Sequence, residues 1–363
     1  MPDNALMQLA DLTDTERAVA ARFATGSELD VTGWPDPAVR AEALRFIVLG
    51  GVTAEPGDRA ELRLTGARVD GALEVDFTDV DAPITLTRCT FDAPISFFGS
   101  HLRRLTLDGS EFPKLTLGNS TVDGSVALRG CTSTGLVGLG GATIGGSLLM
   151  RGALLAGPGI AFDSTSLRVR RDVLADEGFT CRGAFRLDRA EIDGILSLER
   201  AVLHGSGDTG ATGLRADDIS RGGLDDAEWA TSVAFSGRHL VTRELILLPA
   251  EKPGGLVDLR HAKVGLLRDN PSTWPPGLRI DGLTYEAVSD VDDRVPWLQK
   301  DPRGYRPQPY AQLAQVYRAA GRDEDARTVL LAGERDRRGT LSRPGRWWGH
   351  LQDRTVGYGY RPV

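Results

Sequence analysis

Short apolar triplets recur through the middle of the chain at an almost constant spacing. In each of them two apolar residues flank a smaller or polar one, as at 84–86, 95–97 and 105–107. This alternation is typical of a short strand with one buried face. The triplets begin ten or eleven residues apart, and small-any-apolar phrases such as 120–122 and 142–144 fall between them. Two strand types per period indicate a repeating coil of about 21 residues.

This period favours a β-solenoid over a helix bundle or a sandwich. Amphipathic helices need a 3.6-residue period, and antiparallel hairpins need Asn-Gly or Asp-Gly turns at the strand ends. In stacked parallel coils each residue pairs with its equivalent one coil away, so a small residue recurs wherever the chain turns a corner. We therefore predict a mainly β protein in which residues 56–290 form a right-handed parallel β-helix of about eleven coils.

Residues 1–55 are predicted to form a helical cap on the first coil. Thr13 and Glu16 have the spacing of a capping box, and the helix that they begin is expected to end at Gly26. Asp36 is expected to cap a second helix. Such a cap would cover the backbone edge and the apolar interior of the first coil.

Residues 291–363 are predicted to close the other end. Within them, 309–320 and 324–337 have the apolar spacing of a helix hairpin, which resembles one tetratricopeptide-type unit. A single unit cannot bury its apolar face alone, so we expect it to pack on the last β-coil. The sequence after the second helix is rich in arginine and aromatic residues and is expected to be peripheral.

Composition and charge narrow the function classes. The formal net charge of -7 argues against a general nucleic-acid binder, which needs a basic surface. The 44 glycines and the aromatic content of 6% suit a narrow core of small and aliphatic side chains. No stretch of about eighteen apolar residues occurs, so we expect the printed sequence not to span a bilayer.

The three cysteines show neither a disulfide pattern nor a metal pattern. They form no CxxC spacing and are odd in number. Cys89 and Cys131 occupy the small-residue position of the repeat, so we expect both thiols to be buried and unreactive.

Two resemblances rest on these motifs. The phrase apolar-any-Gly-any-apolar-any-apolar, at 69–75, 122–128, 144–150 and 192–198, makes the solenoid similar to a divergent pentapeptide-repeat β-helix, although the usual Ala-Asp/Asn-Leu wording is largely lost. The opening LTDTERAVAARFATGSELDV, the GARVDGALEV coils and the ending QPYAQLAQVYRAAGRDEDARTVLLAGERDRR with WW and GYGYRP resemble actinobacterial β-helix proteins that go under the name membrane-associated oxidoreductase. The second resemblance spans nearly the whole chain, and its motifs are architectural.

The second resemblance also implies a location. In that family hydrophobic helices often follow the Gly-Tyr-Arg-Pro ending, which implies either a soluble member or a chain trimmed before a membrane segment. We expect a cytoplasmic protein, or one at the cytoplasmic face of a membrane. Basic and aromatic residues near the C-terminus are suited to an interaction surface there: Arg337, Arg338, Arg346, Trp347 and Trp348. A tail folded back over the last coil explains them equally well.

Two features invite a chemical interpretation, and each has a simpler one. Residues 205–210 match the letters GxGxxG, but no βαβ unit surrounds them, so we interpret them as a loop. Asp76, Asp79 and Asp81 are weak candidates for a calcium site. Exposed turns also favour aspartate, and we prefer that interpretation. No catalytic or cofactor-binding residue and no cofactor is predicted.

The simplest function is a non-enzymatic scaffold or protein-interaction module whose protein partner is unknown. A DNA-mimicking partner of a topoisomerase is one alternative, but it needs a dense acidic face, which six arginines interrupt: Arg103, Arg104, Arg168, Arg170, Arg171 and Arg182. An enzyme built on a β-helix is the other alternative. It would be either carbohydrate-active or the oxidoreductase of the family name.

Overall fold

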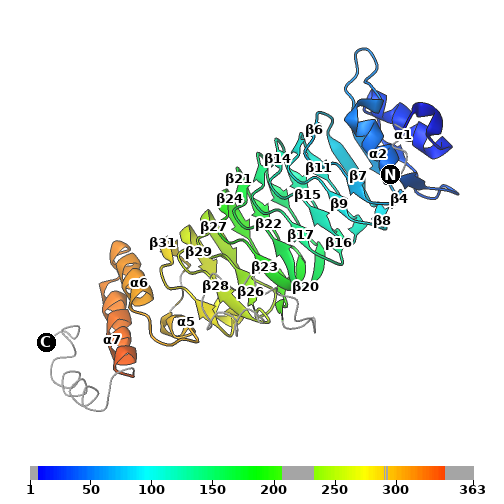
Figure 1. Cartoon of the computed structure of the whole chain (residues 1–363). Helices are drawn as coiled ribbons and strands as arrows, with labels where there is room; N and C mark the ends of the chain where they lie inside the picture. The colour runs from blue at the N-terminus through cyan, green and yellow to red at the C-terminus, as the bar shows by residue number, and fades with distance from the viewer. Residues whose placement is uncertain (1–6, 207–232, 290, 292, 340–363) are drawn as a thin grey trace, which may run out of the picture.

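The structure is a computed structural model that describes residues 7–206, 233–289, 291 and 293–339. These residues form a β-solenoid of about nine turns with helices at both ends (Figure 1). The mainly β, parallel solenoid predicted from the triplets is confirmed. There are fewer turns than the expected eleven because some connections are much longer than a corner. Glu191 and Val241 pair directly, for example, although a long stretch of chain separates them.

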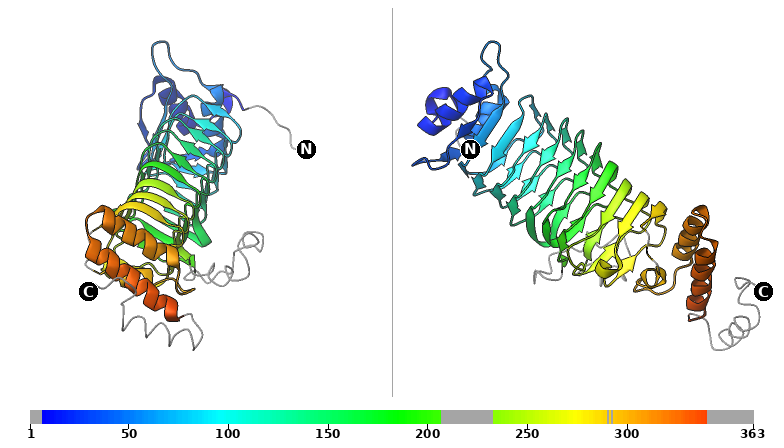
Figure 2. Two further views of the ribbon diagram at one scale, coloured as in Figure 1. Left: turned by 90° about the vertical axis from the view of Figure 1, so that its left-hand side faces the viewer. Right: turned by 180° about the vertical axis from the view of Figure 1, so that it is seen from behind.

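Each regular coil has four sides with one short strand on each. One such coil consists of β7 (Ile84–Thr87), β8 (Thr90–Phe91), β9 (Ile95–Ser96) and β10 (His101–Leu102). We name these sides face 1, face 2, face 3 and face 4 in that order. Each strand pairs in parallel with its equivalents in the coils before and after it. Figure 2 shows the stack of coils from two further sides.

The other strands follow the same assignment. Face 1 contains β1 (Leu29–Asp30), β3 (Leu62–Thr65), β11 (Leu105–Thr106), β15 (Val126–Ala127), β19 (Leu148–Leu149) and β22 (Val173–Leu174). Face 2 contains β2 (Ala38–Arg40), β4 (Arg68–Asp70), β12 (Glu111–Phe112), β16 (Thr132–Ser133) and β25 (Val202–Leu203). Face 3 contains β5 (Leu73–Glu74), β13 (Leu115–Thr116), β17 (Val137–Gly138), β26 (Val233–Ser236), β28 (Leu256–Asp258) and β30 (Leu278–Arg279). Face 4 contains β6 (Asp79–Val80), β14 (Thr121–Val122), β18 (Thr143–Ile144) and β21 (Arg168–Val169).

Longer strands run around a corner and join two faces. β20 (Leu154–Asp163) and β23 (Thr180–Arg186) pass from face 2 to face 3. Four strands pass from face 4 to face 1: β24 (Glu191–Ser197), β27 (Val241–Leu247), β29 (Lys263–Asp269) and β31 (Thr284–Val288).

The core is a set of columns in which equivalent inward side chains stack from coil to coil. On face 1 Ile84 lies next to Leu105, and neither is more than 1% exposed. On face 3 the rings of Phe162, Phe185 and Phe235 stack with centroid separations of 4.8 and 5.9 Å. Each fully buried side chain of this size stabilises the fold by about 1.5–3 kcal/mol. The predicted strand alternation therefore produces the solenoid's interior.

One corner of the solenoid requires left-handed backbone in every coil. Between faces 3 and 4 the following residues, one from each coil, have positive φ: Phe77, Gly99, Asn119, Gly141, Ser166, Arg189, His239, His261 and Gly282. Non-glycine residues reach this conformation at a cost of about 1 kcal/mol. At Gly99 a Cβ atom would lie 2.7 Å from the exposed Phe77 ring, so a larger residue there would require this ring to move.

The first helix, α1 (Asp14–Thr25), matches its prediction. The Thr13 hydroxyl accepts from Glu16 N, the Glu16 carboxylate accepts from Thr13 N, and Gly26 ends the helix with φ of 65°. Glu16 also binds the Arg40 guanidinium and Arg40 N. Burial alone would raise the pKa of Glu16, but these hydrogen bonds and the Arg40 charge lower it to about 2. The capping residue thereby also joins α1 to the first coil.

The second helix differs from its prediction. Residues 38–40 form β2, in which Val39 pairs with Val69, and α2 (Ala41–Phe46) begins only after this strand. Asp36 therefore does not cap the helix, and its carboxylate instead accepts from Ala38 N in a turn. Parallel pairing with β4 leaves Val39 only 1% exposed. The free energy gained by this burial outweighs the local preference of residues 38–40 for a helix. A single π turn, η2 (Ile47–Gly51), continues α2.

The C-terminal helix hairpin is confirmed as a cap on the last coil. It consists of α6 (Pro307–Ala319) and α7 (Asp323–Gly339), preceded by the short helix α5 (Val295–Leu298). Gln308 Nε2 donates to Leu283 O at 2.9 Å, and Gln312 Nε2 donates to Tyr285 O at 2.8 Å. These side chains satisfy backbone carbonyls at the exposed edge of β31 that a further coil would otherwise bind.

Candidate interaction surfaces

The three aspartates considered for a calcium site lie on two different faces. The Asp76 carboxylate, on face 3, accepts from Ser96 Oγ at 2.6 Å and from Phe98 N at 2.8 Å in the next coil. Asp79 and Asp81 lie around the corner on face 4. In the part of the chain that the structure describes, no three His, Cys, Asp or Glu side chains are grouped to hold a metal ion. The turn interpretation of Asp76 therefore has a physical basis in hydrogen bonds to the next coil.

The same use of a corner aspartate recurs along the solenoid. Asp108 accepts from Arg129 N at 2.9 Å, and Asp188 accepts from Arg238 N at 3.1 Å. In both cases the arginine side chain also binds the carboxylate, so one residue joins two coils through backbone and side chain. These carboxylates are structural groups that fix the register of neighbouring coils.

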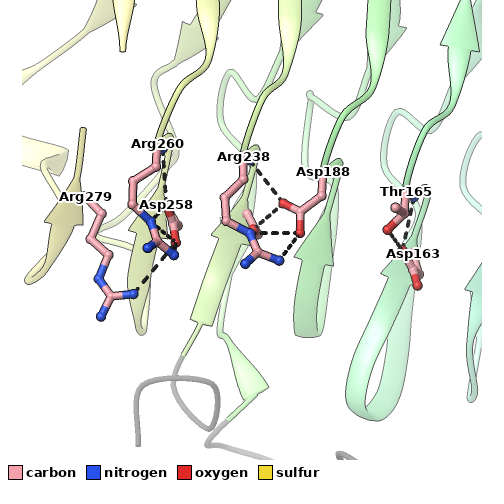
Figure 3. A network of polar contacts seen from close by, with 8 residues as sticks. Asp163, Thr165, Asp188, Arg238, Asp258, Arg260 and Arg279 are labelled. Atoms are coloured by element: carbon pink, nitrogen blue, oxygen red, sulfur yellow. Dashed lines mark hydrogen bonds and ion pairs between the residues drawn. The ribbon is translucent and has the colours of Figure 1, made fainter. Parts of the chain in front are cut away.

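A polar ladder crosses face 3 in the second half of the solenoid (Figure 3). Arg238 Nη2 lies 2.5 Å from Asp188, Arg260 Nη2 lies 2.7 Å from Asp258, and Arg279 Nη1 lies 3.9 Å from Asp258. The Asp188 side chain is 8% exposed and the Asp258 side chain 6%. Burial would raise the pKa of Asp188, but the hydrogen bonds and charge of Arg238 lower it overall. In this ladder Asp188 binds one arginine and Asp258 is shared by two.

Face 4 carries a second ladder in which opposite charges alternate. Arg103 binds Asp81 at 2.9 Å and Asp123 at 2.6 Å, so it joins three consecutive coils. Further along the same face, Arg168 pairs with Glu191 at 3.4 Å and Arg170 pairs with Asp193 at 3.5 Å. Arg103, Arg168 and Arg170 thus lie next to acidic residues in space. This face has no dense acidic strip over the residues named.

Two histidines form an exposed stack at the corner between faces 3 and 4. The rings of His239 and His261 lie 5.0 Å apart with an interplanar angle of 20°. Desolvation, the neighbouring His261 and the charges of Arg189 and Arg238 lower the pKa of His239. The sequence showed these residues only as scattered histidines, because their spacing has meaning only once the coil length is known.

A groove lies between the N-terminal cap and the first coils. It has a volume of about 1000 Å³ and is bounded by residues of α1, η2, the segment before β3, β6 and the coil that follows β10. Its apolar lining includes Phe23, Val48, Leu49 and Pro83. Its rim is charged: Arg59, Glu61, Asp79, Asp81, Arg103 and Arg104. No sequence pattern marked this groove, because it depends on how the cap sits on the coils.

Phe77 is an exposed aromatic residue next to this groove. Its side chain is the most exposed large apolar one described, at 76%, and its ring meets that of Phe98 edge to face at 5.4 Å. A bulky residue in left-handed backbone, here with φ of 53°, is uncommon. No sequence signal marked Phe77, since its exposure follows from its corner position.

The cysteines are buried, as predicted for Cys89 and Cys131. All three, including Cys181, are 0% exposed. Burial raises the pKa of Cys89 to about 11 and that of Cys131 to about 12. Burial raises the pKa of Cys181 as well. These thiols fill the core.

The C-terminal interaction residues are only partly within the described structure. Arg337 lies in the last turn of α7 and pairs with Glu334 at 2.7 Å, and Arg338 is 7% exposed. Arg346, Trp347 and Trp348 lie outside the described residues. So does most of the glycine-rich stretch at 205–210, of which Gly205 is described with φ of 83°. Within the described segments no helix has the length and apolar character to cross a membrane.

Comparison with known proteins assigns the chain to no family. No protein-family model matches the chain, and neither a curated protein nor a solved structure matches it. The two resemblances drawn from its motifs stay predictions.

Proposed function

We propose that the chain is a non-enzymatic scaffold whose solenoid faces present an extended surface to a protein partner. One observation carries this proposal: the polar side chains that could support chemistry are used to join coils. Asp76, Asp108 and Asp188 each accept hydrogen bonds from the next coil. Charges on face 4 are likewise paired across coils by Arg103. Polar side chains at the surface thus link neighbouring coils at several places along the solenoid.

The proposal is tested with charge-reversal variants of single faces. Full-length protein and two variants, Arg168→Glu with Arg170→Glu on face 4 and Arg129→Glu on face 1, are used as baits after equal thermal stability has been verified. A partner that co-purifies in stoichiometric amounts with the natural chain and is lost from one variant only supports the proposal. Turnover of a defined substrate by the purified chain, abolished by one point substitution, overturns it.

The finer part of the proposal places the scaffold at the cytoplasmic face of a membrane. The support is the basic and aromatic composition of the C-terminal sequence, including Arg337, Arg346 and Trp347. Flotation with vesicles of phosphatidylcholine and phosphatidylserine tests it. We expect binding that weakens as salt rises from about 0.1 to 0.5 M and that disappears when residues 340–363 are deleted. Equal flotation of the deleted and full-length chains contradicts this part and leaves the scaffold proposal intact.

A further inference from the structure

β6 is the first strand of face 4 and pairs on one side only. Its neighbour is β10, in which His101 is the partner of Asp79. His101 N donates towards the preceding coil, to Thr78 O at 3.0 Å. Asp79 occupies the position of His101 one coil earlier. Its N–H and C=O therefore also point toward the N-terminal end of the solenoid, and so do those of Asp81. No strand among the described residues pairs with this edge.

The groove described above runs along this edge. Asp79 and Asp81 line it together with Thr78, and the apolar residues Val48 and Leu49 line it as well. The volume of about 1000 Å³ is at the upper end of that of small-molecule sites, and a short extended peptide also fits this range. An additional strand at β6 would therefore find both backbone partners and apolar residues.

The charges at the edge indicate which side chains such a strand would carry. The side chains of Asp79 and Asp81 point to solvent and are 86% and 91% exposed. On their C-terminal side they contact His101 and Arg103 of the next coil. Their other side, along the groove, carries no strand. Directly opposed charges on neighbouring strands stabilise a pair, whereas like charges destabilise it.

The solenoid itself contains the completed form of this arrangement. Residues 191–193, Glu-Ile-Asp, hold the same two columns of face 4 as residues 79–81, Asp-Val-Asp. The strand of the preceding coil that pairs with them contains residues 168–170, Arg-Val-Arg, with Arg168 opposite Glu191. The ion-pair distances are 3.4 Å for Arg168 and Glu191 and 3.5 Å for Arg170 and Asp193. A basic-apolar-basic strand is thus what this acidic-apolar-acidic pattern pairs with elsewhere in the chain.

We propose that the groove binds an extended segment of a partner protein with the pattern basic-apolar-basic, which adds a strand to the free edge of β6. In this complex the N–H of the central apolar residue donates to Asp79 O, and its C=O accepts from Asp81 N. Its side chain turns inward towards Val48 and Leu49, and the two basic side chains lie beside the Asp79 and Asp81 carboxylates. Strand addition of this kind combines main-chain affinity with side-chain specificity. The inference rests on the proposed function in that it assigns a partner to the scaffold.

The probe for this site is a dye-labelled peptide, Thr-Arg-Val-Arg-Thr, titrated with the full-length chain by fluorescence anisotropy. A matched peptide, Thr-Glu-Val-Glu-Thr, and the first peptide N-methylated at its valine serve as comparators. We expect saturable binding of the first peptide, and binding at least about tenfold weaker for each comparator. The N-methyl group removes the central N–H without changing the charge, so it separates strand addition from simple attraction of cations.

The variant Asp79→Lys with Asp81→Lys should weaken binding of the Arg-Val-Arg peptide by at least about tenfold. The matched control, Glu191→Lys with Asp193→Lys, reverses the same two columns inside the solenoid and should leave binding unchanged. Lack of binding up to about 1 mM, equal binding by the N-methylated peptide, or equal effects of the two double variants overturns the inference. If this happens while a whole-chain partner is still lost from a single face variant, the scaffold proposal stands without this groove.

Discussion

The imidazole rings of His239 and His261 stack across two consecutive coils, 5.0 Å apart. Both residues have left-handed backbone, with φ of 57° and 59°, so the corner holds their side chains directly one above the other. The charges that face His239 come from Arg189, Arg238 and His261 and, with opposite sign, from Asp188. Protonation of His239 would therefore place another cation beside Arg189 and Arg238 at this corner.

The histidine stack predicts a loss of stability in mild acid. The pKa of His239 is lowered in the folded chain from 6.5, first by desolvation and then by His261. A lowered pKa means that the unfolded chain binds the proton more tightly, so the stabilisation is complete above pH 6.5 and declines as the pH falls below it. Because the ring is largely exposed, the decrease in melting temperature from this group should be about 2 °C or less.

The measurement is the melting temperature between pH 8 and pH 5 for the natural chain and for His239→Asn, which tolerates left-handed backbone. The pH-dependent decrease should be smaller in the variant. Identical pH profiles would show that the stack does not contribute.

The buried ion pair beneath the C-terminal cap should be one of the most sensitive sites of the fold. Arg294 binds Asp269 at 2.5 Å, with side-chain exposures of 0% and 2%, and Trp274 Nε1 also donates to Asp269 at 2.9 Å. Asp269→Asn leaves the Arg294 cation buried without its counter-charge. We expect the free energy of unfolding in urea to fall by about 3–5 kcal/mol.

A control for this effect is Glu191→Gln, which removes a carboxylate from an ion pair that is more than half exposed. It should change the free energy of unfolding by less than about 1 kcal/mol. Comparable losses in the two variants would contradict the special role assigned to the buried pair.

The glutamine contacts on β31 are expected to prevent association of two chains through the C-terminal edge of the solenoid. Gln308→Ala with Gln312→Ala removes the side-chain amides that bind Leu283 O and Tyr285 O. We expect the free energy of unfolding to fall by about 1–3 kcal/mol and the chain to self-associate through the uncovered edge. Sedimentation velocity and urea unfolding measure these two effects. Gln315→Ala, an exposed position of the same helix, should change neither.

Two glycines next to helix C-termini should differ in their tolerance of alanine. Gly26 and Gly321 both have left-handed backbone, with φ of 65° and 73°. A Cβ atom at Gly26 would lie 2.5 Å from the Arg59 carbonyl oxygen, whereas one at Gly321 would meet nothing within 4 Å. Gly321→Ala should cost about 1 kcal/mol from backbone strain alone, and Gly26→Ala clearly more. Equal losses in urea unfolding would show that the Arg59 carbonyl moves away freely.

The solenoid could be predicted from the sequence because its buried core residues recur at a nearly fixed spacing. Inward residues such as Ile84 and Leu105 recur at the same place in each coil, and their pairing is what the structure shows. The capping box of Thr13 and Glu16 is equally local and was also predictable. Strand β2 was not, because Val39 is drawn into the ladder by Val69 of the next coil, a contact that no local pattern encodes.

The candidate surfaces were largely beyond prediction for the same reason. Asp76, Asp79 and Asp81 are neighbours in the sequence, yet the corner at Phe77 turns the first away from the other two. The side chains that do contact them belong to the next coil, as Ser96 contacts Asp76. Once the coil length is known, lining up residues one coil apart would have shown the alternating charges of face 4. The groove at β6 also needs the placement of η2, which follows from packing.

The pairing of Phe185 with Phe235 shows that alignment between coils does not depend on how many residues join them. The stacked rings and the flanking backbone bonds give β23 and β26 the same register, although residues 187–232 separate the two strands in the sequence. A foreign module spliced between Ser206 and Val233 would thus leave and rejoin the molecule within one coil, because β25 and β26 both pair with β23. This makes the junction a natural graft point for a fluorescent reporter or an affinity handle, carried on the side of an otherwise intact rod.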